Sequence, residues 1–327
     1  MDEPLPIPPV AAPQQPATDP QLSPTDAPSA PIITTPNPAK NVFFGPKGLR
    51  AGWGMLLFAA IFIGIAQTVG RIVHHLRHLP PNAHSPVTIH GMLISETFAV
   101  LFVFLATYIM SRIEKRPFTS YGLAGTRRLP LFFTGLFWGF AFISLLVGTL
   151  HVTHFITFDA GHASLHAALK YGAVWAAIFV LVGFFEEILL RGYLQWTLWR
   201  GIGFWWAALI LSIAFGAIHG KNPGESPVGL FSAGAVGLVF CLAIWYTRSL
   251  WWAIGAHAAW DWGQTFVYGA SDSGLPAKGS FLVSHPQGKL WLSGGATGPE
   301  GSIFILPTLA VMAVVIYLTL RSHPTVD

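Results

Sequence analysis

Long apolar stretches separated by short polar segments are the feature that most constrains how this chain can fold. Of its 327 residues, 53% are hydrophobic and only 10% are charged, whereas a soluble protein carries about a quarter charged residues. A helix needs about 20 mostly apolar residues to cross the hydrocarbon core of a bilayer. Such stretches lie at approximately 51–70, 90–111, 130–150, 171–198, 203–219, 228–247, 250–269 and 303–320. Because backbone groups in lipid must be satisfied internally, we predict an all-α polytopic transmembrane helix bundle of about eight spans.

The first 45 residues differ in composition from the rest of the chain. They are rich in Pro, Ala, Thr, Gln and Asp and show no apolar periodicity. A segment of this kind buries too little apolar surface to offset the entropy of ordering its backbone. We therefore predict a disordered Pro-rich N-terminal tail over 1–45 and a transmembrane domain over 46–327.

The basic residues are divided unevenly between the two ends of the predicted spans. With the N-terminus in the cytoplasm, eleven Lys or Arg residues fall on cytoplasmic segments and six on outer segments. Most of this bias comes from the 112–128 loop, and cytoplasmic loops carry the excess of basic residues in membrane proteins. We predict that both termini are cytoplasmic. We attribute the formal net charge of +4 to this topology and expect no nucleic-acid partner.

Three charged residues lie within six positions of the apolar stretch GFFEEILLRGYL at 183–194. Glu187 and Arg191 are four residues apart, so on an α-helix they share a face and can pair. Glu186 is rotated by about 100° from Glu187 and has no such partner on its own helix. A charged residue inside a membrane is a functional candidate. We interpret Glu187 as the structural partner of Arg191 and Glu186 as the carboxylate available for chemistry.

Further polar residues interrupt other predicted spans. His219 ends the stretch SIAFGAIHG, and His257 and Asp261 are four residues apart in GAHAAWDWGQ. Glu96 lies alone in LISETFAV, where it either bonds a neighbouring helix or contacts a cavity. Carboxylates and imidazoles that meet in one cavity can activate a water molecule. Counting residues into the spans places His219 and His257 roughly 13 Å apart in depth, so a shared cavity requires short, tilted or broken helices.

These residues form three motifs in order: Glu186-Glu187-x-x-x-Arg191, Phe215-x-x-x-His219 and His257-x-x-x-Asp261. The set resembles the signature of the CPBP family, which contains type II CAAX prenyl endopeptidases and bacteriocin-processing or immunity proteins of the Abi group. The resemblance covers roughly 120–320 and implies an intramembrane metalloendopeptidase. Prenyl endopeptidases usually carry Asn at the last motif position, and Asp261 departs from that pattern. A carboxylate accepts hydrogen bonds where an amide also donates them.

The resemblance assigns roles to these residues. It implies that Glu186 is the general base, that His219 orients the water or binds a metal, and that His257 and Asp261 form the opposite wall. Glu187 completes the catalytic set, and Arg191 supports it. Glu186, His219 and His257 are also the donor types of a zinc site with an open position. The sequence leaves open whether Zn²⁺ is bound or a metal-free Glu/His mechanism operates.

The short loops and the charge bias are typical of a bacterial cytoplasmic (inner) membrane protein. Prenylated substrates are then not expected, so we predict a membrane-associated peptide or protein as substrate, with the lipid bilayer as the other partner. One alternative is a non-catalytic bacteriocin-immunity or scaffold protein that keeps the motifs for structure. A transporter is the other alternative, but transporters often have repeated halves with interrupted helices, and the sequence shows no such repeat.

Overall fold

The structure is a computed structural model that describes residues 42–46, 48–76, 88–161, 164–272 and 278–321. The chain divides into a unit up to Val42 and a second unit from Phe43 to Asp327. Residues 1–41 of the predicted tail lie outside the described residues. Phe44–Gly45, at the end of the predicted tail, forms strand β1, which pairs antiparallel with β2 (Gly48–Leu49).

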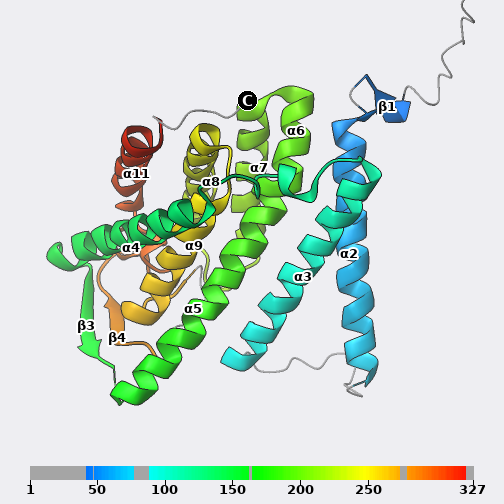
Figure 1. Ribbon diagram of the computed structural model, residues 1–327. Coiled ribbons are helices and arrows are strands. Elements are labelled where there is room, and N and C mark those ends of the chain that lie inside the picture. The colour runs from blue at the N-terminus through cyan, green and yellow to red at the C-terminus, as the bar shows by residue number, and fades with distance from the viewer. Residues whose placement is uncertain (1–41, 47, 77–87, 162–163, 273–277, 322–327) are drawn as a thin grey trace, which may run out of the picture. The chain divides into compact units, whose positions relative to one another are not determined.

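Helices make up most of the second unit (Figure 1). The longer ones are α2 (Ala51–Leu76), α3 (Ile89–Ile113), α4 (Arg128–Val152), α5 (Leu165–Glu187), α6 (Gln195–Ile202), α7 (Phe204–His219), α8 (Pro227–Thr247), α9 (Trp251–Trp262) and α11 (Ile305–Leu320). The shorter ones are α10 (Leu290–Ser293), the 3₁₀ turns η1 (Phe118–Ser120) and η4 (Pro299–Gly301), and the π-helical segments η2 (Ile188–Leu194) and η3 (Gly263–Val267). Strands β3 (Ile156–Ala160) and β4 (Leu282–Pro286) pair antiparallel.

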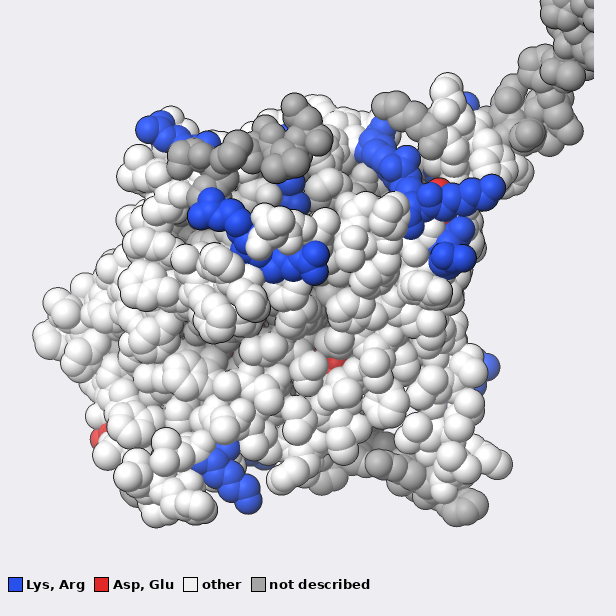
Figure 2. Space-filling model, in the orientation of Figure 1, with Lys and Arg blue, Asp and Glu red and all other residues white. Residues whose placement is uncertain are grey.

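The predicted all-α membrane helix bundle is confirmed. Among the described residues, five helical segments are long and apolar enough to cross a membrane. They are Ala51–Leu76, Ile89–Ile113, Arg128–Val152, the continuous Leu165–Ile202 and Pro227–Thr247. The remaining three predicted spans correspond to shorter helices, α7, α9 and α11, with 16, 12 and 16 residues. Figure 2 shows a broad band of uncharged residues on the visible face, with Lys and Arg gathered mainly above it.

Local sequence signals explain where the spans begin and break. The side chains of Thr88, Ser164 and Ser226 each accept a hydrogen bond from a backbone N–H in the first turn of α3, α5 and α8, as helix N-caps do. Gly203 separates α6 from α7 with a φ of 89°, a conformation that costs glycine little. The chain therefore turns there and sends α7 back into the bundle.

Helix α9 lies in the centre of the bundle, packed against α4 and α5. A Cβ added at Gly135 or Gly139 of α4 would collide with the backbone of α9 at Trp252 or Ala256. Small residues allow this close backbone approach, which is the usual way that helices pack in membranes. The α4–α9 contact fixes the position of the helix that carries two of the motif residues.

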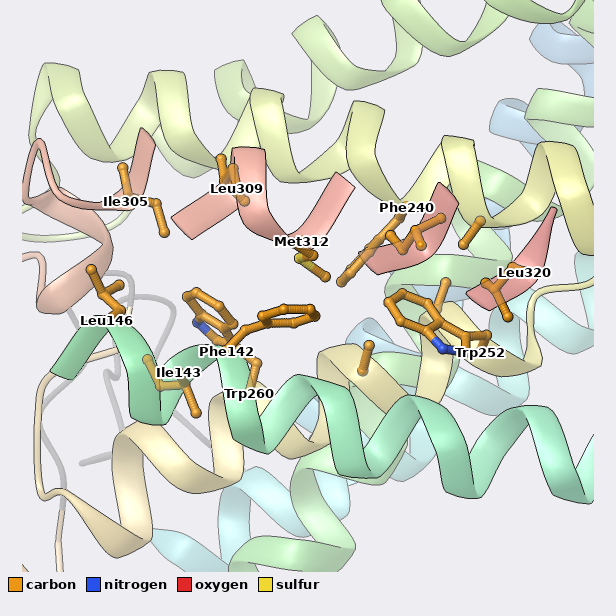
Figure 3. Close-up of a cluster of buried hydrophobic side chains, with 14 of the residues drawn as sticks. Phe142, Ile143, Leu146, Phe240, Trp252, Trp260, Ile305, Leu309, Met312 and Leu320 are labelled. Carbon is orange, nitrogen blue, oxygen red and sulfur yellow. The ribbon is translucent and has the colours of Figure 1, made fainter. Parts of the chain in front are cut away.

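A buried apolar cluster holds α9 against its other neighbours (Figure 3). The cluster includes Phe142 and Leu146 of α4, Phe240 of α8, Met312 of α11 and Trp252 of α9, and each of these is at most 3% exposed. Burying a large apolar side chain contributes about 1.5–3 kcal/mol for each such residue. This packing provides a rigid frame for the polar residues on the adjacent faces of α8 and α9.

The segment that follows Glu187 differs from the continuous α-helix that the sequence predicts. Residues 188–194 are π-helical, and Gly192 has ψ of −117°, outside the helical range. Single π-turns inside α-helices are frequent at functional sites. The segment nevertheless keeps Arg191 within bonding distance of Glu187.

Candidate active site

Glu187 is the centre of a fully buried group of charges. Its Oε1 atom accepts hydrogen bonds from Arg191 Nη1 at 2.9 Å and from His257 Nδ1 at 2.9 Å. The side chains of Glu187 and Arg191 are both 0% exposed. The predicted pair with Arg191 is therefore present. The bond to His257 is an additional contact, because the sequence interpretation gave Glu187 no partner on another helix.

The Arg191 guanidinium is held by aromatic rings as well as by Glu187. Its Cζ atom lies 4.4 Å from the centre of the Phe215 ring and 6.0 Å from that of Phe240. Cation–π contacts of this kind strengthen when water is excluded. Within the described part of the chain, Arg191 Nε and Nη2 have no hydrogen-bond partner. Arg191 thus depends strongly on the single carboxylate of Glu187.

His257 lies between three carboxylates. Its Nδ1 atom faces Glu187, and its Nε2 atom lies 3.6 Å from Glu186 Oε2 and 3.4 Å from Asp261 Oδ2. Because a carboxylate only accepts hydrogen bonds, the 2.9 Å contact requires a proton on Nδ1. Glu187 thereby fixes the ring orientation and points Nε2 toward Glu186 and Asp261.

Glu186 is held much less firmly than Glu187. Its side chain is 26% exposed, and its one ion-pair contact in the described structure is the 3.6 Å approach to His257. That distance is longer than a hydrogen bond. Glu186 therefore keeps accepting capacity for a ligand or a water molecule.

His219 contributes a second imidazole from the end of α7. Its Nδ1 atom lies 2.8 Å from the carbonyl oxygen of Phe215. A carbonyl oxygen only accepts, so Nδ1 carries the proton and Nε2 is the acceptor of the neutral ring. The first residue of the Phe215-x-x-x-His219 motif thus sets the histidine tautomer through its backbone.

All four cavity residues predicted from the sequence line one cavity of about 240 Å³: Glu186, His219, His257 and Asp261. Helix α7 has 16 residues and is about 24 Å long, shorter than the roughly 30 Å hydrocarbon core. His219 is the last residue of this short helix. The structure nevertheless brings it to the same cavity as His257, which residue counting alone had placed at a different depth.

The same cavity is lined by polar residues outside the three motifs: Glu96, Asn222, Ser232, Asp272 and Glu300. The sequence had already offered the cavity as one of two positions for Glu96. The other four were missed, because loops and a neighbouring helix bring them in without any helical spacing. The lining contains five carboxylates and no Lys or Arg, so the cavity has a strongly acidic lining.

Asp272 lies at the edge of this acidic cavity, after the end of η3. Gln264 Nε2 donates to the Ser271 carbonyl at 2.8 Å and approaches Asp272 Oδ1 at 3.5 Å. Burial raises the pKa of the Asp272 carboxyl well above its usual value, and Asp261, Glu300 and Glu186 raise it further. Like charges disfavour a further ionised carboxylate in this way.

The cavity residues do not form a metal-binding group in this arrangement. Among the residues that the structure describes, no three His, Cys, Asp or Glu side chains are placed to hold a metal ion. His257 uses Nδ1 for Glu187, and its Nε2 faces two carboxylates. The zinc site predicted from Glu186, His219 and His257 is not formed in this arrangement and stays a prediction.

Comparison with protein families gives a match. A family model described as type II CAAX prenyl endopeptidase Rce1-like matches residues 168–263. The matched segment runs from α5 to the first residue of η3 and contains all three motifs. No curated protein and no solved structure matches the chain.

Proposed function

We propose that this chain, which matches the Rce1-like CAAX endopeptidase family model over residues 168–263, is an intramembrane endopeptidase that cleaves a membrane-associated peptide or protein. The apolar helices and the family match support an integral membrane protein of a protease type. The reaction, its residues and its substrate are our proposal.

The contrast between the two adjacent glutamates supports the proposal best. Glu187 is fully buried and bonded to both Arg191 and His257, whereas Glu186 is 26% exposed and lines the cavity. A general base must keep accepting capacity and lie within reach of the proton that it removes. Glu186 meets the first condition, and its place in the cavity wall supports the second.

In the proposed reaction, a water molecule in the cavity loses a proton to Glu186. The resulting hydroxide attacks the carbonyl carbon of the peptide bond and gives a tetrahedral oxyanion. Collapse of this intermediate breaks the C–N bond, and the proton on Glu186 passes to the leaving amine. His219 Nε2, which the Phe215 carbonyl leaves as the ring's acceptor, orients the water.

The other motif residues hold this arrangement in place. Arg191 neutralises Glu187, Glu187 fixes the ring of His257, and His257 separates Glu186 from Asp261. Asn222 lines the cavity and supplies an amide donor for the oxyanion. That role matters because Asp261 occupies the position where prenyl endopeptidases usually carry an amide.

We derive no step through a metal ion, because the described side chains do not form a metal-holding group. Zinc remains a prediction of the family resemblance. If present, it would supply a more acidic water molecule.

The proposed substrates are membrane-anchored peptides or bacteriocin leaders in a bacterial cytoplasmic membrane. The cavity lies among the apolar helices α3, α5, α7, α8 and α9, so the scissile bond must reach membrane depth. This requirement favours a substrate that is already anchored in the bilayer.

Peptide hydrolysis in heavy-oxygen water tests the proposal on the whole set of membrane peptides at once, so no single substrate has to be chosen. Hydrolysis places one heavy oxygen in each new C-terminal carboxyl group. Membranes that contain the wild-type protein should yield labelled C-termini of membrane peptides that are missing with Glu186→Gln. The same labelled termini at equal levels in both samples would contradict the peptidase.

A further inference from the structure

A second cavity, separate from the candidate active site, lies where α3 and α6 end. Its volume is about 420 Å³. It is lined by Arg116, Ser120, Tyr121, Trp196, Trp199 and Arg200, none of which lines the active-site cavity. Half of these residues follow the end of α3 at Ile113, and half belong to α6, which ends at Ile202.

The charges of this cavity are arranged in two layers. Glu114 forms the inner layer and is 6% exposed, whereas Arg200 and Arg116 are 25% and 40% exposed. Arg200 Nη2 lies 2.7 Å and Arg116 Nε 3.6 Å from Glu114 Oε2. One carboxylate therefore holds two guanidinium groups from the protein side, and the outer layer keeps a net positive charge.

The hydroxyl groups around Glu114 complete the inner layer. Tyr193 donates to Glu114 Oε1 at 2.5 Å, and Tyr121 donates to Oε2 at 3.5 Å. Burial, followed by the negative charge of Glu114, raises the pKa of Tyr121 to about 12, so this phenol stays protonated at neutral pH. The hydrogen bonds of Glu114 are thereby satisfied from the protein side, and the two arginines outnumber its single negative charge.

The position of the cavity matches the headgroup level of a bilayer. It lies where the apolar helices α3 and α6 end, and Trp196 and Trp199 line it; tryptophan is enriched at that level of membrane proteins. The Nε1–H of Trp196 is buried and has no hydrogen-bond partner in the described structure. Figure 2 shows basic residues gathered at one end of the uncharged band.

We propose that this cavity binds the phosphate group of an anionic phospholipid. Arginine guanidinium groups match phosphate oxygens with paired N–H donors, and basic pockets between transmembrane helices bind anionic headgroups. The two tryptophan rings flank the glycerol and the first carbons of the acyl chains. Because the cavity lies at the headgroup level of the bilayer, the bound phosphate group is more readily supplied by a lipid than by a free phosphate ion.

Lipid binding to the purified full-length protein in neutral detergent tests the site. Phosphatidylglycerol is titrated, and the fraction of lipid-bound protein is measured by native mass spectrometry. Arg116→Gln should weaken the apparent affinity about tenfold, since one charged hydrogen bond is lost. Arg112→Gln is the matched control, because it removes an exposed charge near the same helix end without touching the cavity. Equal losses in both variants would mean a diffuse charge effect and would overturn the site.

A second pair of variants leaves every native charge in place. Ser120→Glu adds a negative charge to the cavity wall and should weaken phosphatidylglycerol binding, whereas Ser120→Gln should change it less than about twofold. Phosphatidylcholine with the same acyl chains should bind more weakly than phosphatidylglycerol. Equal binding of the two lipids, or displacement of the lipid by an equal concentration of soluble glycerol phosphate, would overturn the assignment. These measurements need no substrate and do not depend on peptidase activity.

Discussion

Two groups of polar and charged residues each include members of the helical segment Leu165–Ile202, and they differ in how their carboxylates are used. The inner cluster consists of Glu186, Glu187, Arg191, His257 and Asp261, and its Glu187–Arg191 pair is fully buried. The end cluster consists of Glu114, Arg116, Tyr121, Tyr193 and Arg200, and it has one carboxylate against two arginines.

The carboxylates of the two clusters differ in how many hydrogen bonds they accept and in whether they face the cavity. Glu187 in the inner cluster and Glu114 in the end cluster each accept from two or more donors. The inner cluster also contains Glu186 and Asp261, which face the cavity at 3.6 and 3.4 Å from His257. A surplus of carboxylates over cations at membrane depth is costly. This surplus supports the proposal that the inner cluster carries out the chemistry, whereas the end cluster has a surplus of positive charge.

The largest effect on stability should follow the loss of the inner cation. Arg191→Met leaves Glu187 buried beside His257 without its full counter-charge, which costs about 3–5 kcal/mol for a buried pair. The measurement is the free energy of unfolding in detergent. The double variant Glu187→Gln/Arg191→Met should be less destabilised than Arg191→Met alone, because no unpaired charge remains at these two positions. A double variant that is at least as destabilised as Arg191→Met alone would contradict this account.

The substitution Glu114→Gln in the end cluster should lower the free energy of unfolding by a smaller amount. The amide oxygen still accepts from Tyr193, and Arg116 and Arg200 are exposed enough to be hydrated. We expect a cost of about 1–2 kcal/mol, measured in the same way, with the cleavage rate of the folded protein close to wild type. A cost equal to that of Arg191→Met would remove the distinction between the clusters.

The smallest effect should be a pH dependence that originates at Asp272. The folded-state pKa of its carboxyl is raised by burial and by neighbouring carboxylates. Its stabilising contribution is therefore present at low pH and is lost as the pH rises through the folded-state pKa. Asp272→Asn imitates the protonated form, so the Tm of the variant should exceed that of wild type increasingly from about pH 4 upward. Parallel Tm curves for the two proteins would contradict the prediction.

The sequence predicted the fold and the motif residues because both depend on short-range spacing. Apolar run lengths located the helices, and the spacing of four residues paired Glu187 with Arg191 and His257 with Asp261. The bond between Glu187 and His257 joins α5 to α9, and no local pattern encodes it.

Other features of the site depend on the tertiary structure. Asp272 reaches the cavity from a loop and Glu300 from the short turn η4. The close packing of α4 on α9 that positions His257 uses Gly135 and Gly139, whose spacing of four residues is a known signal of helix contact in membranes that the sequence analysis did not use. The π-helical turn after Glu187 includes Gly192, but a single glycine in a helical pattern does not distinguish a π-turn from an ordinary helix. The end cluster was not predicted, since its members come from two segments, 114–121 and 193–200, that lie far apart in the sequence.

The measurement that tests the central claim most directly is the cleavage rate of Glu186→Gln compared with wild type, on a peptide identified by heavy-oxygen labelling. The variant keeps the shape of the side chain but does not take up the proton of water. We predict an unchanged Tm and a rate reduced about 10²- to 10⁴-fold per folded molecule. A wild-type cleavage rate in the folded variant would show that Glu186 is not the base and would contradict the division of roles between Glu186 and Glu187.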